Sequence, residues 1–272
     1  MDFQIPIRNR LILTAIFILV IISLISCEEL QQKYVKQDKM FRLAHLEDGR
    51  IADSWLINNQ LLSDPDPALR ARAAMTIGRI GSEYYSRELL KNLRDSDPRA
   101  AESKFFAAGL LADTAFADSL LILAKEDGPA REVALEALGR IVDSSRATDL
   151  AEFLSSPETE IVYQAILALW RSGGWSMAEK VAQAGLTTEN RRVKWAALYA
   201  LSRGRRIEGR ELYRHLLSDV DPEFRIPAYQ GLGRSADTTS LELIATGLND
   251  ADDRVVAAAI TSLRRFGRLG LT

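Results

Sequence analysis

Few side chains in this sequence could perform covalent or metal chemistry, and their spacing does not bring them together. There is one cysteine, Cys27, and the two histidines, His45 and His215, lie far apart. One cysteine excludes an internal disulfide and a CxxC metal site. The sequence also lacks a Walker loop, an HExxH motif, a GxSxG elbow and a GxGxxG turn after a strand. We therefore expect no enzyme activity, no catalytic residue and no cofactor.

Two pairs of aspartates are the remaining candidates for metal ligands. Asp64 with Asp66, and Asp219 with Asp221, could suggest a calcium site because carboxylates are the ligands that calcium prefers. Both pairs fall at the same place in a repeating pattern of the sequence, which favours roles in turns and helix caps. We expect no metal site.

The segment that precedes Cys27 indicates the role of this cysteine. Two arginines near the start are followed by an uncharged apolar run, which ends in the residues Leu-Ile-Ser-Cys. A basic start, an apolar middle and a small residue before the cut are typical of a secretory signal. The last four residues resemble a bacterial lipobox. This resemblance implies a signal peptide over residues 1–26, cleavage after Ser26 and a lipid on Cys27.

An uncleaved transmembrane helix is the alternative for this segment. About 20 apolar residues are needed to span a bilayer, and the run from Leu11 to Ser26 is a little short. Under either interpretation the rest of the chain is tethered and faces away from the cytoplasm, so we expect it in the bacterial cell envelope. Residues 27–50 would form a stalk and an N-terminal helix.

A period of about 31 residues runs through the remainder of the chain. Its anchor positions are Gly78, Gly109, Gly139, Trp170, Ser202, Gly233 and Arg264. Every unit has leucine sixteen residues before its anchor, and six of the seven have alanine five residues before it. The four anchor glycines follow apolar stretches, and we interpret them as positions where a helix turns or ends. Repetition at such a period indicates a solenoid.

Each unit is expected to form two helices joined by a tight turn. Twelve residues before the anchor stands a polar residue, mostly of a type preferred at helix N-caps: Asp66, Asp97, Asp127, Glu158, Asn190, Asp221 and Asp252. The residue two before the anchor is always small, which lets neighbouring helices approach closely. Because one hairpin cannot bury its apolar face alone, we predict an all-α solenoid of about seven helical hairpins over residues 51–272.

These features resemble the short HEAT, or PBS-lyase-type HEAT-like, repeat family. The best match is SDPDPALRARAAMTIGRIG, residues 63–81, and the resemblance covers roughly residues 51–267. The resemblance implies a right-handed superhelix of antiparallel helix pairs. It gives almost no information about activity. Two units depart from the pattern. Lys104 replaces a buried alanine, and Pro227 lies inside a second helix, where we expect a kink.

A basic residue recurs eight positions before the anchor in four units: Arg70, Arg131, Lys194 and Arg225. These residues could form a basic stripe for an acidic partner. Alternatively, each could pair with the register aspartate of a neighbouring unit, in an internal ladder. The resemblance to HEAT-like repeats favours the ladder.

One surface is a candidate binding site. In HEAT-like solenoids the second helices line the concave face, and the positions seven and three before the anchor point away from the core. In units four to six these positions hold Tyr163, Leu167, Trp195, Tyr199 and Ile226. Exposed apolar patches often mark interaction sites, and Tyr and Trp are common in binding hot spots. We predict a protein or peptide partner here, with Glu132 and Glu136 at the edge. Another part of the chain, a second copy or tight curvature could instead cover the patch.

The sequence as a whole predicts a lipid-anchored, protein-binding scaffold or adaptor of the cell envelope. A net charge of −2 gives no sign of nucleic-acid binding, and no small-molecule site is evident. An alternative comes from residues 40–81, where the run HLEDGRIADSW resembles secreted HEAT proteins that carry a cyclophilin-type prolyl isomerase domain. The chain would then be the HEAT portion, or a remnant, of such an isomerase without its catalytic domain. A bilin-lyase-like protein is a further alternative, although no pigment site can be identified.

Overall fold

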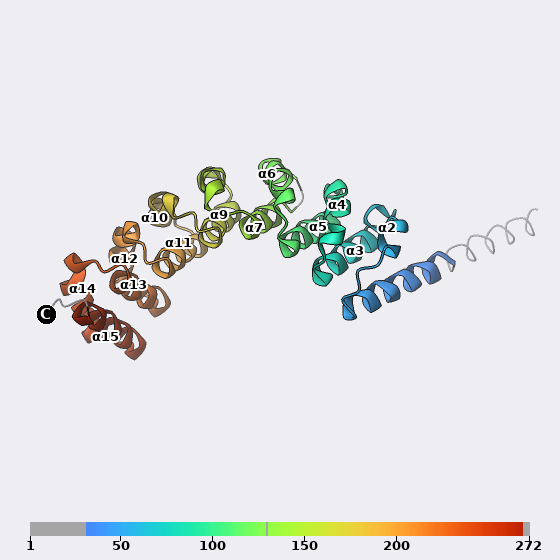
Figure 1. Ribbon diagram of the computed structural model, residues 1–272. Coiled ribbons are helices and arrows are strands. Elements are labelled where there is room, and N and C mark those ends of the chain that lie inside the picture. The colour runs from blue at the N-terminus through green and yellow to red at the C-terminus, as the bar shows by residue number, and fades with distance from the viewer. Residues whose placement is uncertain (1–30, 129, 269–272) are drawn as a thin grey trace, which may run out of the picture.

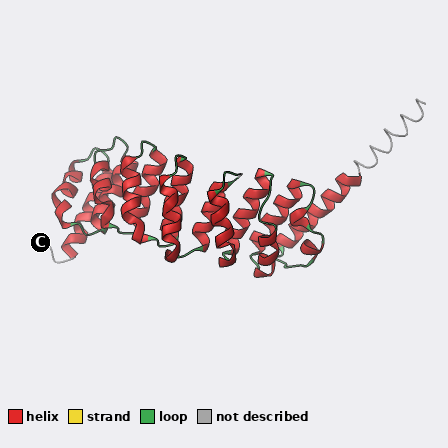
Figure 2. Ribbon diagram, turned by 90° about the horizontal axis from the view of Figure 1, so that it is seen from above, coloured by secondary structure: helices red, strands yellow, loops and turns green. Residues whose placement is uncertain are grey.

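Helix pairs follow one another in a gently curved array that begins with a helix over residues 31–48 and ends with α15 (Figure 1). The computed structural model describes residues 31–128 and 130–268, so the predicted signal peptide and Cys27 lie outside the described residues. Seen from above, neighbouring helices stand side by side along the array (Figure 2). The described residues form helices and no strand, which confirms the predicted all-α HEAT-like array.

The inner layer of the curve consists of the second helix of each pair (Figure 1). Each of these helices packs against the next one along the array. They are α3 (Pro67–Ile80), α5 (Pro98–Leu111), α7 (Arg131–Ile141), α9 (Thr159–Arg171), α11 (Arg191–Arg203), α13 (Pro222–Arg234) and α15 (Asp253–Arg268).

The outer layer consists of the shorter first helices, most of which open with a 3-10 turn. They are α2 (Trp55–Asn58), α4 (Ser86–Lys91), α6 (Ala117–Lys125), α8 (Ala147–Ala151), α10 (Ala178–Thr187), α12 (Arg210–Leu216) and α14 (Leu241–Thr246). Three are followed by a 3-10 segment: η1 (Leu61–Ser63) after α2, η5 (Glu152–Ser155) after α8 and η9 (Gly247–Asn249) after α14. Together the two layers make the seven predicted pairs.

Polar N-caps start most second helices, as the repeat pattern predicts. The side chains of Asp66, Asp97, Asn190, Asp221 and Asp252 accept hydrogen bonds from backbone N–H groups in the first helical turn. The prediction is wrong at two places. The Glu158 side chain makes no cap bond. Helix α7 begins at Arg131, so Asp127 lies outside it and pairs with the Arg131 side chain instead.

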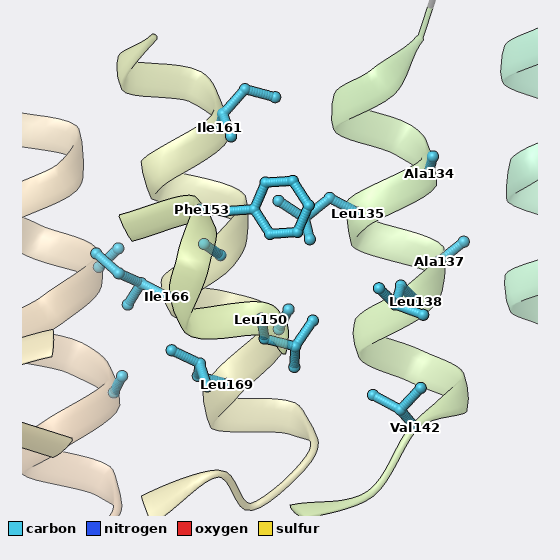
Figure 3. Packing of buried hydrophobic residues seen from close by; sticks show 14 of the residues in the cluster. Ala134, Leu135, Ala137, Leu138, Val142, Leu150, Phe153, Ile161, Ile166 and Leu169 are labelled. Carbon is cyan, nitrogen blue, oxygen red and sulfur yellow. The ribbon is translucent and has the colours of Figure 1, made fainter. Parts of the chain in front are cut away.

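The core is one apolar seam between the two layers, and it is shared by successive pairs. Figure 3 shows the seam where the third pair meets the fourth: Leu135 and Leu138 of α7 face Leu150 of α8, Phe153 of η5 and Leu169 of α9. All five side chains are buried. Each pair therefore completes its core with apolar groups from its neighbours.

The anchor glycines do not end helices, so that interpretation is wrong. Gly139 lies inside α7, and a methyl group on it would be only 2.5 Å from the Cα and Cβ atoms of Ala168 in α9. Gly78 and Gly109 face Ala107 and Ala137 in the same way. Gly233 faces Ser262. The glycines permit close approach of neighbouring second helices, and the small residue two before the next anchor fills the contact.

The first and sixth units form an arginine ladder, but its acceptor is not the predicted register aspartate. Arg70 donates from Nε and Nη2 to both carboxylate oxygens of Asp95, at 2.8 and 2.7 Å, and Arg225 binds Asp250 in the same way. A further guanidinium N–H of each arginine binds a carbonyl in the turn before its own helix. The accepting aspartate lies two residues before the cap aspartate, in the turn of the next unit. The ladder therefore ties each turn to the following one.

The third unit makes the predicted contact, and the fifth unit uses a variant of it. Arg131 reaches Glu158 of the next unit at 2.7 Å, as expected. In the fifth unit the ion pairs run from Arg191, not from Lys194, to Asp219 and Asp221 at 3.3 and 3.2 Å. The aspartate pairs that could have suggested calcium are thus bound to cationic side chains, Lys39 and Lys36 for Asp64 and Asp66 and Arg191 for Asp219 and Asp221, and to backbone N–H groups.

Lys104 is buried inside the array and pairs with Asp95. The side chain of Lys104 is 3% exposed, and its Nζ lies 2.8 Å from Asp95 Oδ2. Burial would raise the pKa of Asp95, but hydrogen bonds from Arg70 and Lys104 outweigh burial and hold that pKa well below its usual value. Burial also lowers the pKa of Lys104, against the opposing effect of Asp95. One carboxylate therefore compensates two cations.

The helix over residues 31–48 packs on the first repeat with its second half. Leu43 and Leu46 are buried, Lys39 pairs with Asp64 at 2.7 Å, and Glu47 pairs with Arg72 at 2.6 Å. Helix α13 continues through Pro227. Within residues 31–128 and 130–268, no helix has both the length and the apolar character needed to cross a bilayer.

Candidate functional site

The five residues predicted to bind a partner lie on three neighbouring inner-layer helices. Tyr163 and Leu167 are on α9, Trp195 and Tyr199 on α11, and Ile226 on α13. These helices pack in sequence, α9 on α11 and α11 on α13. Trp195 is 38% exposed, whereas the other four side chains are half-buried, and Tyr163, Leu167 and Ile226 pack against the edge of the core. The patch is therefore partly open and is not enclosed by the curvature of the array.

Three aromatic side chains make the centre of this surface, and we call them the aromatic cluster: Trp170, Trp195 and Tyr199. The rings of Trp195 and Tyr199 are stacked, with centroids 4.9 Å apart and planes at 15°. They are four residues apart on α11, so they lie one turn above the other on the same face. Trp170 of α9 meets Tyr199 edge-on, at 5.2 Å and 75°. Each geometry is favourable for aromatic pairs.

Trp170 was missed as a site residue because it stands at an anchor position of the repeat. Its period predicted a structural role at a helix end. A signal was available, since Trp170 is the only aromatic among the seven anchors. Five of the other six anchors are glycine or serine, so a large ring at this position is expected to contact a neighbouring side chain rather than fit between the two helices.

Tyr163 is held by a different contact. The guanidinium of Arg192 lies 4.2 Å from the ring centroid of Tyr163 and also pairs with Glu160. A cation over an aromatic face is attracted by the ring quadrupole. Tyr163 is thus linked to α11 through Arg192, beside the aromatic cluster. Leu167 and Ile226 contribute apolar edges where they pack against the core.

The acidic edge is weaker than the sequence suggests. Both Glu132 and Glu136 are half-buried on α7, but Glu136 is paired with Arg140 of the same helix at 2.8 Å. The Arg140 guanidinium also lies 5.8 Å from the Phe106 ring of α5. One of the two carboxylates at this end of the inner face is therefore compensated.

Metal-binding side chains do not gather in the described part of the chain. His45 and His215 are both exposed, one on the N-terminal helix and the other on α12. Over residues 31–128 and 130–268, no three His, Cys, Asp or Glu side chains gather in a way that could hold a metal ion. What the inner face offers is a contact surface of rings and charges.

Comparisons with known proteins agree with this fold. A family model described as HEAT repeats matches residues 57–139. Among solved structures, the X-ray structure of YibA from Escherichia coli is similar with a TM-score of 0.57 and 17% identity, over 82% of this chain and 96% of that one. The crystal structure of an engineered protein is similar with a TM-score of 0.52 and 16% identity, over 83% of this chain and 74% of that one.

No curated protein sequence matches the chain. At identities below a fifth, the two structural similarities concern the fold alone. The matched repeats, the two structures and the seven helix pairs lead to one conclusion: the chain is an all-α array of HEAT repeats.

Proposed function

We propose that this protein is a lipid-anchored scaffold of the bacterial cell envelope that holds a protein or peptide partner on its inner face. The aromatic cluster is the observation that carries the proposal. A stacked Trp195–Tyr199 pair supported by Trp170 is a rigid apolar platform, and its outer ring keeps 38% of its surface exposed. Rigid aromatic groups give large contact area at a low entropic cost, and they dominate many binding interfaces.

Two features of the array support a scaffold role. The second helices lie next to each other along the inner side of the curve, so a partner can extend over several repeats (Figure 1). The ladder contacts from Arg70 to Asp95 and from Arg225 to Asp250 tie successive repeats together near the two ends of the array. A preorganised surface binds with less loss of conformational entropy.

The test is in-cell crosslinking of the full chain followed by identification of captured proteins. The wild type is compared with a Trp195→Ala/Tyr199→Ala variant and with Tyr84→Ala, a matched control that removes an exposed tyrosine just before α4. Loss of a central aromatic contact of this kind costs about 2 kcal/mol or more, which is roughly thirtyfold in affinity. We expect one partner to disappear only in the double variant. A set of captured proteins that is unchanged in the double variant, at equal helicity, would refute the proposal.

Anchoring is tested separately at Cys27. We expect the wild-type chain to incorporate a labelled fatty acid and to lose the mass of residues 1–26. Cys27→Ser should abolish both changes. An uncleaved membrane helix would instead give a full-length, unlabelled chain in the membrane fraction, and Cys27→Ser would leave it unaltered.

A further inference from the structure

The inner face carries an arginine at nearly every repeat, one residue after the anchor. The predicted site uses the positions seven and three before the anchor. The position one after the anchor lies four residues beyond the latter, so it is one turn further along the same face of the helix. These three positions form a stripe, which on α11 reads Trp195, Tyr199, Arg203. Six of the seven residues are arginine, and we call them the arginine row: Arg79, Arg140, Arg171, Arg203, Arg234 and Arg265, with Leu110 as the exception.

The two halves of the arginine row differ in their partners. In the N-terminal half, Arg79 pairs with Glu47 at 2.5 Å and Arg140 pairs with Glu136 at 2.8 Å. In the C-terminal half, the described residues place no carboxylate within 4.0 Å of the four remaining arginines, Arg171, Arg203, Arg234 and Arg265. The arginines of the row are thus paired with carboxylates in the N-terminal half. In the C-terminal half they have no carboxylate partner among the described residues, and we call these four arginines the open half of the row.

Like charges concentrate at the open end. An open cleft of about 420 Å³ lies between the ends of α13 and α15, and its lining includes Arg205, Arg234, Arg264 and Arg265. Arg234 is half-buried, and its Nη1 donates to the hydroxyl of Ser202 at 3.1 Å. Burial lowers the pKa of Arg234, and repulsion from Arg203, Arg265 and Arg205 lowers it further. An anion in this cleft would relieve that repulsion.

Helix stability alone accounts for part of the pattern. An arginine in the last turn of a helix interacts favourably with the helix dipole, and five members of the row occupy such positions. The dipole does not require that four adjacent repeats lack a carboxylate, nor that Arg205 and Arg264 add charge to the same cleft. Elsewhere in the array, arginines such as Arg70 and Arg225 are paired.

The spacing of the arginine row fits an extended polypeptide. Neighbouring packed helices lie about 8–10 Å apart, and an extended chain advances about 3.3–3.6 Å per residue. One acidic residue in every three would then meet successive arginines. We propose that the open half of the arginine row binds an acidic, extended peptide segment of the partner, beside the aromatic cluster. This inference rests on the proposed function, since it assigns the chemistry of the partner held on the same face.

Charge favours a peptide over a single-stranded nucleic acid. The Arg203 guanidinium lies 5.9 Å from the Tyr199 ring, so the basic and aromatic parts of the surface are continuous. Towards the N-terminal half, however, the same stripe reaches Glu132 and Glu136. A phosphate backbone following the groove would run into these carboxylates, and the whole chain has a net charge of −2. Binding of nucleic acid usually needs a strongly basic surface throughout.

The experiment measures fluorescence anisotropy of labelled peptides with the full chain released in detergent. The probe is a dodecapeptide of four Glu-Leu-Ser triplets, and its Gln-Leu-Ser analogue is the neutral control. The variant Arg203→Gln/Arg265→Gln removes two exposed members of the open half. The variant Arg79→Gln/Arg140→Gln removes two members of the same register that are already paired, and serves as the matched protein control.

We expect the acidic peptide to bind more tightly than the neutral one and to weaken with salt. Affinity should fall roughly fivefold in Arg203→Gln/Arg265→Gln, as expected for two solvent-exposed ion pairs, and stay near the wild-type value in Arg79→Gln/Arg140→Gln. Equal binding of both peptides, or no difference between the two variants, overturns the inference. Tighter binding of a twelve-nucleotide oligothymidine than of the acidic peptide also overturns it, in favour of nucleic acid.

Failure here is distinguishable from failure of the proposed function. If the peptides bind alike but Trp195→Ala/Tyr199→Ala abolishes their binding, the aromatic surface still holds a partner and only the charge assignment is wrong. If neither peptide binds, the acidic-peptide inference is overturned, while in-cell crosslinking decides the proposed function independently. Helicity and melting temperature of every variant exclude misfolding as the cause of lost binding.

Discussion

Gly139 sets the closest approach between two inner-layer helices, and its replacement by alanine tests how the array is packed. The added methyl group would lie 2.5 Å from Cα and Cβ of Ala168, whereas carbon atoms in contact are about 3.5–4.0 Å apart. The overlap is with backbone as well as side chain, so α7 and α9 must move apart. Overpacking of this kind costs about 1–3 kcal/mol, and the better helix propensity of alanine returns about 0.5–1 kcal/mol. We expect a net loss of roughly 1–2 kcal/mol.

Urea unfolding followed by circular dichroism measures this loss. Gly267→Ala in α15 is the matched control, because nothing lies within 4 Å of a methyl group at that position. Its stability should be unchanged or rise by up to about 1 kcal/mol. An unfolding midpoint for Gly139→Ala that equals or exceeds that of Gly267→Ala would refute the reasoning. It would mean that the helices can adjust without cost, and that the glycine has another role.

Four further substitutions test the polar contacts of the array. Asp95→Asn should lower the free energy of unfolding by roughly 3 kcal/mol, because it leaves Lys104 buried without a charged partner. Lys104→Met should stay within about 1 kcal/mol of wild type, since Asp95 remains paired with Arg70. Comparable losses of stability in both variants would contradict this assignment. Asp95, whose folded-state pKa is depressed, stabilises the fold fully above the unfolded-state pKa of about 3.9, and this contribution is lost as the pH falls through that value towards the folded-state pKa. Urea midpoints measured from about pH 6 down to pH 2 should therefore fall less steeply in Asp95→Asn than in wild type, and parallel curves would refute the assignment. Asp97→Ala should cost about 1 kcal/mol through the lost cap of α5, whereas Asp127→Ala, at the same repeat position, should change the thermal midpoint little because its side chain caps no helix.

The array of seven pairs could be predicted because the period repeats the same physical requirements seven times. A cap such as Asp66 or Asp221, a following proline and a small residue near the helix end each carry weak information alone. Their recurrence at one spacing excludes coincidence. The ladder from Arg70 followed the same logic, and only the exact acceptor, Asp95 in place of the cap Asp97, needed the structure.

The role of the anchor glycines could not be read from the period. Glycine at a helix end and glycine at a close helix contact produce the same sequence signal, since both exploit the missing Cβ atom. The contact between Gly139 and Ala168 depends on how two units are rotated relative to each other. That rotation is set by packing along the whole core between the two layers, and the sequence of a single unit does not reveal it.

The candidate site was predicted in part. The i, i+4 spacing placed Trp195 and Tyr199 on one exposed face of α11, and their stacking follows from that spacing. Trp170 was not predicted as a site residue, because the anchor position at which it stands was interpreted as structural. The contact of Arg192 with Tyr163 also escaped notice, since it joins two units at positions outside the repeat pattern.

The pairing of some arginines of the row with carboxylates indicates where along the array we expect a partner to bind. Its register is nearly uniform in sequence, so sequence alone assigns all repeats the same role. Glu47 breaks this uniformity from outside the repeats, because it lies on the N-terminal helix that packs against α3. Glu136 does so from within α7. Both carboxylates neutralise the first half of the inner face, and the aromatic cluster begins where they end. Repeats with one fold therefore differ in the charge left on their surface, and the proposed site lies in the C-terminal half, where the arginines of the row have no carboxylate partner among the described residues.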